Sequence, residues 1–394
     1  MIKTASQYHH HSSYERHRIG GHYLDWQNQP AVYKEYPGID PVRLPAKTPT
    51  VKGKLPSVLN ETNTGGMAPP LSVEDLSLIL RLTHSLTARA GRPGEDFYYR
   101  SAASAGALYP TEIYTAIRGV RGLDDGLYYF SIRGHALYPL RIDDLSGYIA
   151  GLIFPPPESL PLITFFFTVI FFRSAWKYRD RAYRYHLLDT GHVIENLTLA
   201  AKSLGIPFDL SYDFDDGKIN HLLGLDQKKE VSLALAHLPG AGPVSGFWKK
   251  EIHELSERIK NASIVSKRET DYPAIGEIHR ASEPVISGGG DRDHGMLDGL
   301  GITPSGLEGW PGTFGITNPT DYPECLFRRR SSRNFIKGVL ERAELFAFLD
   351  ALCSDFHGER GRRSIPDRPL CVGFLANHIP VSYTHLTLPT NREV

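Results

Sequence analysis

The pattern of apolar positions along residues 1–240 predicts a sheet with helices packed against it. Strands are expected at 113–120, 127–132, 137–141, 163–172 and 230–238. Short polar turns separate the first three, so we expect a meander that is at least partly antiparallel. The stretch 163–172 is apolar except for two threonines, which is typical of a central strand buried on both faces.

Two helices are expected beside these strands. Ser72 and Asp75 form the pattern of a capping box, and apolar residues follow at helical spacing from Leu76. A longer helix is expected over 187–204, where the apolar positions again repeat at helical spacing. Residues from about 263 to 323 contain scattered Pro and Gly, which indicates a linker and not a packed core.

The composition is that of an ordinary globular protein. The chain has 394 residues, of which 41% are hydrophobic and 22% charged, and two domains are expected. Lys+Arg and Asp+Glu balance at 44 each, so no overall field would attract nucleic acid or an anionic membrane. Three cysteines are too few for a disulfide scaffold and indicate a reducing compartment. With no apolar run of membrane length and no recognisable signal peptide, a cytoplasmic protein is expected.

The N-terminal residues are polar and aromatic and include three adjacent histidines, His9, His10 and His11. Adjacent histidines could suggest a metal site. No pattern of Cys or carboxylate ligands accompanies them, so we expect no metal and interpret residues 1–55 as an exposed arm.

Small side chains mark the stretch that follows Arg100. Ser104, Ala105, Gly106 and Ala107 would let main-chain N–H and C=O groups approach a flat, polar ligand without interference from side chains. The residues alone are equally compatible with a tight, close-packed turn at the start of a strand.

A second unusual stretch, 173–185, mixes four Arg and one Lys with three Tyr and one Trp directly after the apolar strand. Cations beside aromatic rings could bind nucleic acid through phosphate contacts and base stacking. The neutral charge of the whole chain makes this the weaker interpretation, and a solvated basic loop above packed aromatic stems is the simpler alternative.

Three groups of residues together form a recognisable signature. They are Ser104-Ala105-Gly106-Ala107-Leu108-Tyr109-Pro110 with the Gly-Leu and Gly-Leu-Tyr-Tyr motifs that follow it, Lys177-Tyr178 with Arg-x-Tyr-Arg-Tyr and Leu-Asp-x-Gly-His after it, and Arg329-Arg330-Ser331-Ser332-Arg333-Asn334-Phe335. With these motifs the chain resembles the SagB-type dehydrogenases of the FMN-dependent nitroreductase superfamily. The resemblance implies an α+β, nitroreductase-like fold, with a mixed or antiparallel sheet flanked by helices and a partial second copy.

The resemblance also implies an FMN site and an acid/base pair. In this superfamily FMN lies at a dimer interface, between the Arg-Arg-Ser-x-Arg turn of one subunit and the small-residue loop of the other. The cofactor contacts expected here are Arg100, Ser104, Ala105, Gly106 and Ala107, with the loop at the isoalloxazine edge, and Arg329, Arg330, Ser331 and Arg333 at the phosphate. Lys177 and Tyr178 occupy the positions proposed to assist proton removal. A lysine can do this near neutral pH only where burial or neighbouring cations favour its neutral form, and the surrounding arginines could do so.

The two halves of the chain differ in these arginines. When the helix expected from Leu76 is aligned with an amphipathic helix expected around Leu345, residues 60–66 lie opposite 329–335. Residues 60–66 contain no arginine. We therefore expect a fused pseudo-dimer of tandem domains with one composite FMN site, or a homodimer. The expected organisation is an arm at 1–55, a nitroreductase-like domain at 56–245, a linker at 246–323, a truncated second domain at 324–380, and a non-native tail at 381–394 that resembles a translated adapter sequence.

The leading functional hypothesis is FMN-dependent oxidation of an azoline to an azole in a ribosomal peptide. An NAD(P)H-dependent nitro or quinone reductase, acting on a small molecule at the same site, is a second hypothesis. A non-catalytic domain that binds flavin or peptide is a third.

Overall fold

The computed structural model describes residues 2–13, 15, 23–51, 53–61, 63, 65–91, 96–244, 251–283 and 320–332, together with 341, 343, 344 and 347. The strands are β1 (Val42–Arg43), β2 (Leu86–Ala90), β3 (Phe97–Arg100), β4 (Thr111–Ile117), β5 (Gly126–Ser131), β6 (Ala136–Ile142), β7 (Ser159–Ile170), β8 (Asp209–Ser211) and β9 (Glu230–Pro243). The α-helices are α1 (Ala5–Ser13), α3 (Leu55–Asn60), α4 (Val73–Thr83), α5 (Ser146–Ala150), α6 (Phe171–Tyr178), α7 (Ala182–Leu204), α8 (Asp216–Leu223), α9 (Glu257–Lys260), α10 (Pro273–Ser282) and α11 (Tyr322–Arg328). Short 3-10 turns lie at Trp26–Asn28, Ala105–Ala107, Arg179–Arg181 and Asn261–Ser263.

Seven strands form one sheet in the order β1-β6-β5-β4-β7-β9-β8, and every neighbouring pair is antiparallel. The expected meander is β4-β5-β6. β7 lies between β4 and β9, which confirms the prediction of a central strand. Its side chains alternate between two cores, with Phe165 and Phe167 in one and Phe166 in the other. The strand ends at Ile170, and the last two residues of the predicted strand begin α6 instead.

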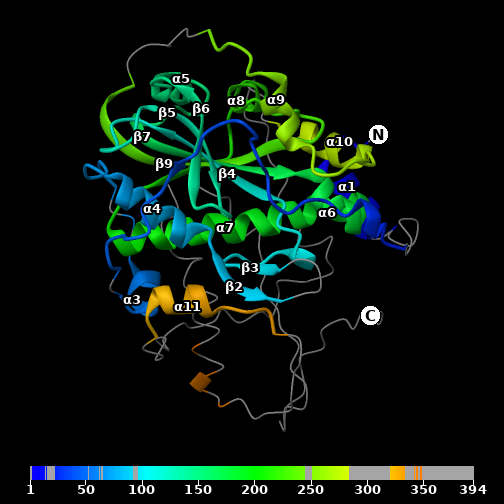
Figure 1. Cartoon of the computed structure of the whole chain (residues 1–394), viewed down its shortest axis with the longest axis horizontal. Helices are drawn as coiled ribbons and strands as arrows, with labels where there is room; N and C mark the ends of the chain where they lie inside the picture. The colour runs from blue at the N-terminus through cyan, green and yellow to red at the C-terminus, as the bar shows by residue number, and fades with distance from the viewer. Residues whose placement is uncertain are drawn as a thin grey trace, which may run out of the picture.

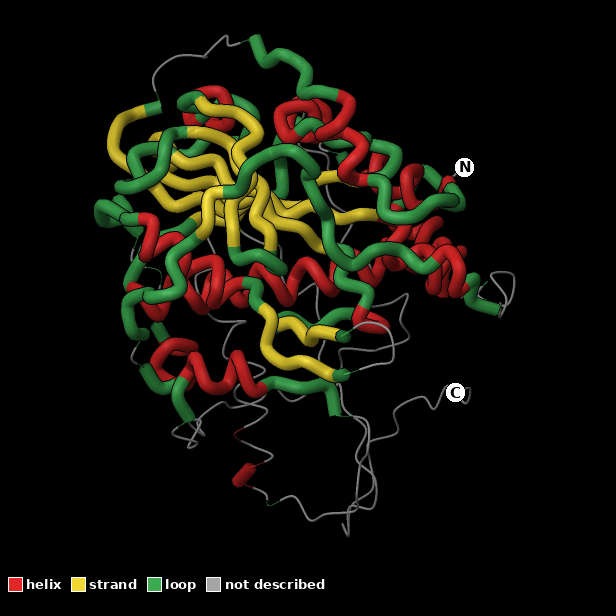
Figure 2. Tube along the Cα trace, in the orientation of Figure 1, coloured by secondary structure: helices red, strands yellow, loops and turns green. Residues whose placement is uncertain are grey.

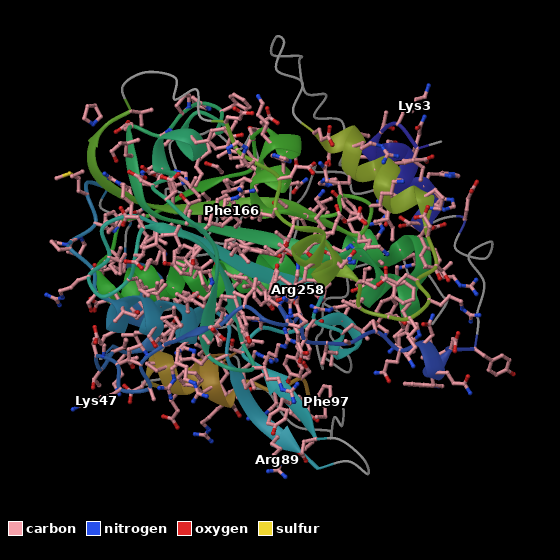
Figure 3. The ribbon with its side chains drawn as sticks, turned by 45° about the horizontal axis from the view of Figure 1, so that its top comes forward. Lys3, Lys47, Arg89, Phe97, Phe166 and Arg258 are labelled. Carbon is pink, nitrogen blue, oxygen red and sulfur yellow. The ribbon has the colours of Figure 1, made fainter. Side chains whose placement is uncertain are left out.

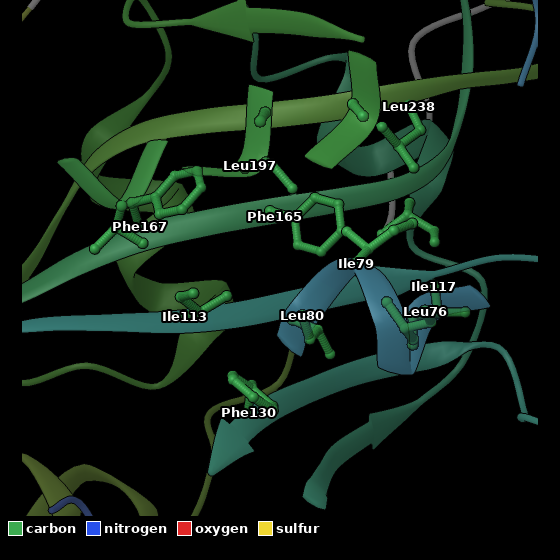
Figure 4. Close-up of a cluster of buried hydrophobic side chains, with 14 of the residues drawn as sticks. Leu76, Ile79, Leu80, Ile113, Ile117, Phe130, Phe165, Phe167, Leu197 and Leu238 are labelled. Carbon is green, nitrogen blue, oxygen red and sulfur yellow. The ribbon is translucent and has the colours of Figure 1, made fainter. Parts of the chain in front are cut away.

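Helices cover both faces of this sheet (Figures 1 and 2). α4 and α7 pack on the face that carries Phe165, where Ile79 and Leu197 join the core (Figure 4). α5, α8 and α9 cover the opposite face around Phe166, which lies in the middle of the molecule, whereas Lys3, Lys47 and Arg89 lie at its rim (Figure 3). The capping box predicted at Ser72 and Asp75 is present at the start of α4.

Two segments are more closely packed than the sequence suggested. In the expected arm, α1 contacts α10 and Tyr8 is buried. In the expected linker, residues 251–283 form α9 and α10, and Ile275 and Ile278 are buried against the domain. The prediction of an unpacked linker is therefore wrong for this segment, because its apolar residues recur at helical spacing within an otherwise polar stretch.

A buried ionic group joins the arm to the sheet. The Lys34 ammonium donates to the carboxylate of Glu230 on β9 and to the Tyr114 hydroxyl on β4, at 2.5 Å for the latter. Ser263 and Thr168 each donate to Glu230 at 2.7 Å. Burial would raise the pKa of Glu230, but the charge of Lys34 and these hydrogen bonds outweigh it and leave that pKa below its ordinary value.

α11 docks on the first domain. Tyr322 and Leu326 are buried among side chains of α3, α4 and α7, and Lys54 pairs with Asp321 at 2.9 Å. The chain therefore returns to the domain before the arginine turn. Most of the expected second domain at 324–380, and the whole tail at 381–394, lie outside the described residues.

We expect Lys34→Met to lower the free energy of unfolding by about 3–5 kcal/mol, because it leaves the Glu230 carboxylate buried without a counter-charge. The double variant Lys34→Met/Glu230→Gln should be markedly more stable than Lys34→Met alone. Urea unfolding followed by tryptophan fluorescence measures both. A double variant no more stable than the single one would show that the pair does not act through charge.

Candidate functional site

The two motifs of the predicted site meet at Gly106. This residue lies in the small-residue loop with a positive φ of 65°. A Cβ added to it would lie 2.8 Å from Tyr178 Oη and 3.1 Å from Lys177 Nζ, so a larger residue would displace both groups. The structure thus brings Lys177 and Tyr178, at the end of α6, against the backbone of the loop.

Backbone strain is concentrated around this contact. Ala107, Tyr109 and Arg179 have φ values of 56°, 49° and 48°, in the left-handed region that non-glycine residues seldom adopt. Only one other described non-glycine residue, His135, has a positive φ. Such conformations persist where surrounding contacts fix them, and they are common at functional sites.

Asp189 of α7, which was not among the predicted site residues, holds the loop in place. Its carboxylate accepts hydrogen bonds from Ser104 Oγ at 2.6 Å and from the Ala105 N–H at 3.1 Å. Ser104 Oγ in turn accepts from the Tyr109 N–H at 2.8 Å. Burial raises the pKa of Asp189 to about 6, although these hydrogen bonds oppose the shift. Its place in the Leu-Asp-x-Gly-His motif was the available signal.

Arg173 of α6 ties the helix to the end of the loop. The buried guanidinium donates to the Tyr109 carbonyl at 2.9 Å and to Glu112 Oε1 of β4 at 2.5 Å. It also donates to the Ala31 carbonyl of the arm at 3.0 Å. Because Arg173 lies one turn before Lys177, these bonds fix where Lys177 sits relative to the loop.

Arg100 is buried, and its guanidinium has partners within the chain. It donates to His84 at 3.1 Å and to the Val32 carbonyl at 2.5 Å, and lies 4.4 Å from the ring centroid of Tyr109. Its predicted contact with a cofactor stays a prediction.

The arginine turn lies at the base of the loop. Arg329 donates to the carbonyls of Ser101 at 2.9 Å and Arg100 at 3.0 Å. Arg330 donates to the Thr87 carbonyl at 3.2 Å, and Ser331 Oγ lies 3.4 Å from the Arg329 guanidinium. The structure thus brings this turn to the residues that precede the loop. Arg333 lies outside the described residues.

A separate open depression of about 420 Å³ lies between the arm and β5–β6. It is lined by Tyr33, Tyr36, Arg133 and Tyr138 among others, and contains none of the predicted site residues. We place the candidate site at the loop, because three independent motifs converge there.

Within the described ranges, no three His, Cys, Asp or Glu side chains are grouped to hold a metal ion. The helices of the described part of the chain include none suited to crossing a bilayer.

Comparison with known proteins identifies the family. The nitroreductase family model matches residues 67–238. A candidate nitroreductase of Methanocaldococcus jannaschii, MJ1384, is 30% identical over 168 residues, which are 42% of this chain and 79% of the relative. The chain belongs to the nitroreductase family. A crystal structure from Anabaena variabilis, described as that of a candidate nitroreductase, superposes with a TM-score of 0.61 at 27% identity and covers 88% of this chain and 67% of that one. The nitroreductase-like fold expected from the sequence is therefore confirmed.

Two further relatives are named for peptide processing. The trifolitoxin-processing protein TfxB of Rhizobium leguminosarum is 30% identical over 171 residues, and the microcin B17-processing protein McbC of Escherichia coli is 27% identical over 140. The matches cover 42% and 34% of this nitroreductase-family chain. The chain spans about half the length of these two relatives, 46% and 52%.

Nitroreductases are generally flavin-dependent, and the residues at the loop fit such a group. Gly106 has no Cβ to cover its backbone, and the residue is exposed. Arg329 and Arg330 donate to carbonyl and hydroxyl oxygens, and the ion pairs of the described residues include neither. Two positive charges beside an exposed main chain suit a flat ring that carries a phosphate.

The substitution Asp189→Asn would keep the shape of the side chain and leave it neutral at every pH. The folded protein holds a proton on Asp189 up to about pH 6, above the ordinary pKa of 3.8, so the neutral carboxyl contributes stability at low pH that is lost as the pH rises through 6. We expect the free energy of unfolding of the wild type, relative to Asp189→Asn, to fall by about 3 kcal/mol between about pH 3 and pH 7. Urea unfolding at a series of pH values measures this difference. Parallel pH curves for the two proteins would contradict it.

Proposed function

We propose that the chain is an FMN-dependent oxidoreductase of the SagB type that oxidises an azoline to an azole in a ribosomally made peptide. The observation that carries this proposal is the meeting of Lys177 Nζ and Tyr178 Oη at the backbone of Gly106. A proton acceptor is thereby held beside the loop that would face the flavin ring. The names of TfxB and McbC support a peptide as the substrate.

Azoline oxidation removes two hydrogens from one ring, one as hydride and one as a proton. When bound, FMN would supply the two-electron chemistry by accepting the hydride. Lys177 and Tyr178 would take the proton at Nζ or Oη, which both reach the same point above the loop. Asp189 and Arg173 would keep the loop and α6 in register for that transfer.

The flavin site we propose is composite within one chain, as expected for a fused pseudo-dimer. The loop from the first half would face the ring, and Arg329, Arg330, Ser331 and Arg333 would hold the phosphate. Docking of α11 on the first domain supports this arrangement, because it brings Arg329 to the carbonyls of Arg100 and Ser101.

A second candidate is an NAD(P)H-dependent nitro or quinone reductase at the same site, which the description of MJ1384 as a candidate nitroreductase favours. The experiment that separates the candidates starts from the absorption spectrum of the purified protein with FMN. Anaerobic bleaching of the flavin by an azoline peptide supports the first candidate, and bleaching by NAD(P)H alone supports the second. Absence of a bound-flavin spectrum would overturn both and leave a non-catalytic domain.

Removing the acid/base groups should slow turnover and spare flavin binding. We expect Lys177→Gln and Tyr178→Phe each to lower kcat by roughly 10²- to 10⁴-fold, the usual contribution of a positioned proton-transfer group. FMN affinity, measured by fluorescence quenching, should stay within about threefold of the wild type. Lys228→Gln, which changes an exposed lysine on the turn before β9, is the control and should leave both unchanged. Full activity of both site variants would contradict the assignment.

Removing the phosphate arginines should weaken flavin binding. We expect Arg330→Ala to raise the Kd for FMN by roughly 10- to 100-fold, since a charge-assisted hydrogen bond to phosphate is lost, and Arg330→Ala/Arg333→Ala to raise it further. Arg328→Ala removes an exposed arginine of α11 that pairs with Glu324 and is the matched control. Unchanged FMN affinity in the double variant would overturn the composite site.

A further inference from the structure

Residues 25–31 of the N-terminal arm contact α6 at two residues that precede Lys177. The indole N–H of Trp176 donates to the Asp25 carbonyl at 2.9 Å. The ring of Trp26 packs edge-on against Trp176, with centroids 5.3 Å apart. One turn earlier on the helix, Arg173 donates to the Ala31 carbonyl. The arm therefore contacts the helix at the residue before Lys177 and at the residue four before it.

The segment that follows α6 is held by α1. Tyr8 donates to the Asp180 carbonyl at 2.5 Å, and His11 lies 3.0 Å from the Asp180 carboxylate. Arg184 donates to Ser12 at 2.8 Å. These contacts enclose the short turn where Arg179 adopts its strained conformation, directly after Tyr178. N-terminal residues thus contact α6 before its two functional side chains and contact the turn and the start of α7 that follow them. α1 lies near α6 and α10 in the fold (Figure 1).

The arm has an anchor of its own, so it can hold the helix in place. The Ala31 N–H donates to the Val265 carbonyl at 2.8 Å, and Lys34 is fixed by the buried group around Glu230. Trp26, in contrast, is 66% exposed, and buries too little surface to be needed for the stability of the domain.

We propose that Trp26 and Trp176 are positioning residues, through which the arm holds Lys177 and Tyr178 at Gly106. The contacts restrict movement of α6 relative to the arm, while the bond from Arg173 to the Tyr109 carbonyl restricts movement of α6 relative to the loop. Loss of the tryptophan contact leaves the helix folded and the flavin loop untouched, but lets the two proton-transfer groups move away from the loop. This inference rests on the proposed function for its kinetic consequence and on the structure alone for its effect on the helix.

The test uses the full chain with Trp26→Ala and Trp176→Phe, the second of which keeps an aromatic ring but removes the indole N–H and makes a buried side chain smaller. Tyr23→Ala is the matched control, since it removes an aromatic ring of the same arm that is fully exposed to solvent. Hydrogen–deuterium exchange of the peptide covering 171–178 is measured without flavin or substrate. We expect exchange to be roughly two- to tenfold faster in both tryptophan variants, which corresponds to the loss of one aromatic or hydrogen-bonding contact, and unchanged in Tyr23→Ala. Midpoints of thermal unfolding should differ little between Trp26→Ala and the control.

The second experiment measures kcat and KM of the same proteins with the azoline peptide, and their affinity for FMN. We expect Trp26→Ala to lower kcat about two- to tenfold, with KM and the Kd for FMN unchanged. Equal exchange of 171–178 in Trp26→Ala and the wild type, or an equal increase in Tyr23→Ala, would overturn the positioning role. If the wild type fails to turn over, the proposed function fails, while the exchange result still decides whether the arm holds the helix.

Discussion

The arrangement of the candidate site depends on the buried guanidinium of Arg173. It joins α6 to two segments that are distant in sequence, the arm through the Ala31 carbonyl and the loop with the start of β4 through the Tyr109 carbonyl and the Glu112 carboxylate. Removing such a charge from water costs several kcal/mol, and only closely placed partners offset this cost. The guanidinium is therefore stable in this position only when the arm, the loop and β4 are in register, and that register is the one that places Lys177 over Gly106.

β4 supplies a partner to both buried cations, Glu112 to Arg173 and Tyr114 to Lys34. Glu112 and Tyr114 are two residues apart on the strand and so point to the same face, toward the arm, while Ile113 points into the core beneath α7. Tyr129 on the neighbouring β5 donates a hydrogen bond to the other oxygen of the Glu112 carboxylate at 2.9 Å. These buried polar side chains of the central sheet thus determine the path of the arm, and the arm in turn contacts α6. A stable fold and a defined site follow from the same set of contacts.

Local patterns predicted the elements whose stability is local or fully apolar. The capping box at Ser72, the meander and the central strand at β7 could be read because capping, turn chemistry and continuous hydrophobicity act over a few residues. The packing of the arm and of 251–283 could not be predicted, since it depends on contacts between residues more than two hundred positions apart, such as Tyr8 and Ile275 in one buried cluster. The role of Asp189 was hidden for the same reason, because a carboxylate inside a helical motif does not show which loop it will bind.

Charge balance is the last constraint on the arginine turn. Burial lowers the pKa of Arg329 below its ordinary value, and the neighbouring charge of Arg330 acts in the same direction, whereas Tyr109 opposes it. Burial of Tyr322 and Leu326 nonetheless holds both arginines against the domain, where the bonds recorded for them run to neutral oxygens. Among the described ion pairs neither guanidinium has a carboxylate partner, so an anion that reaches them would be stabilised, and phosphate is one whose geometry suits their planar donors. The hydrophobic docking of α11 therefore keeps positive charge at the base of the loop before any ligand binds, which lowers the cost of organising the proposed flavin site.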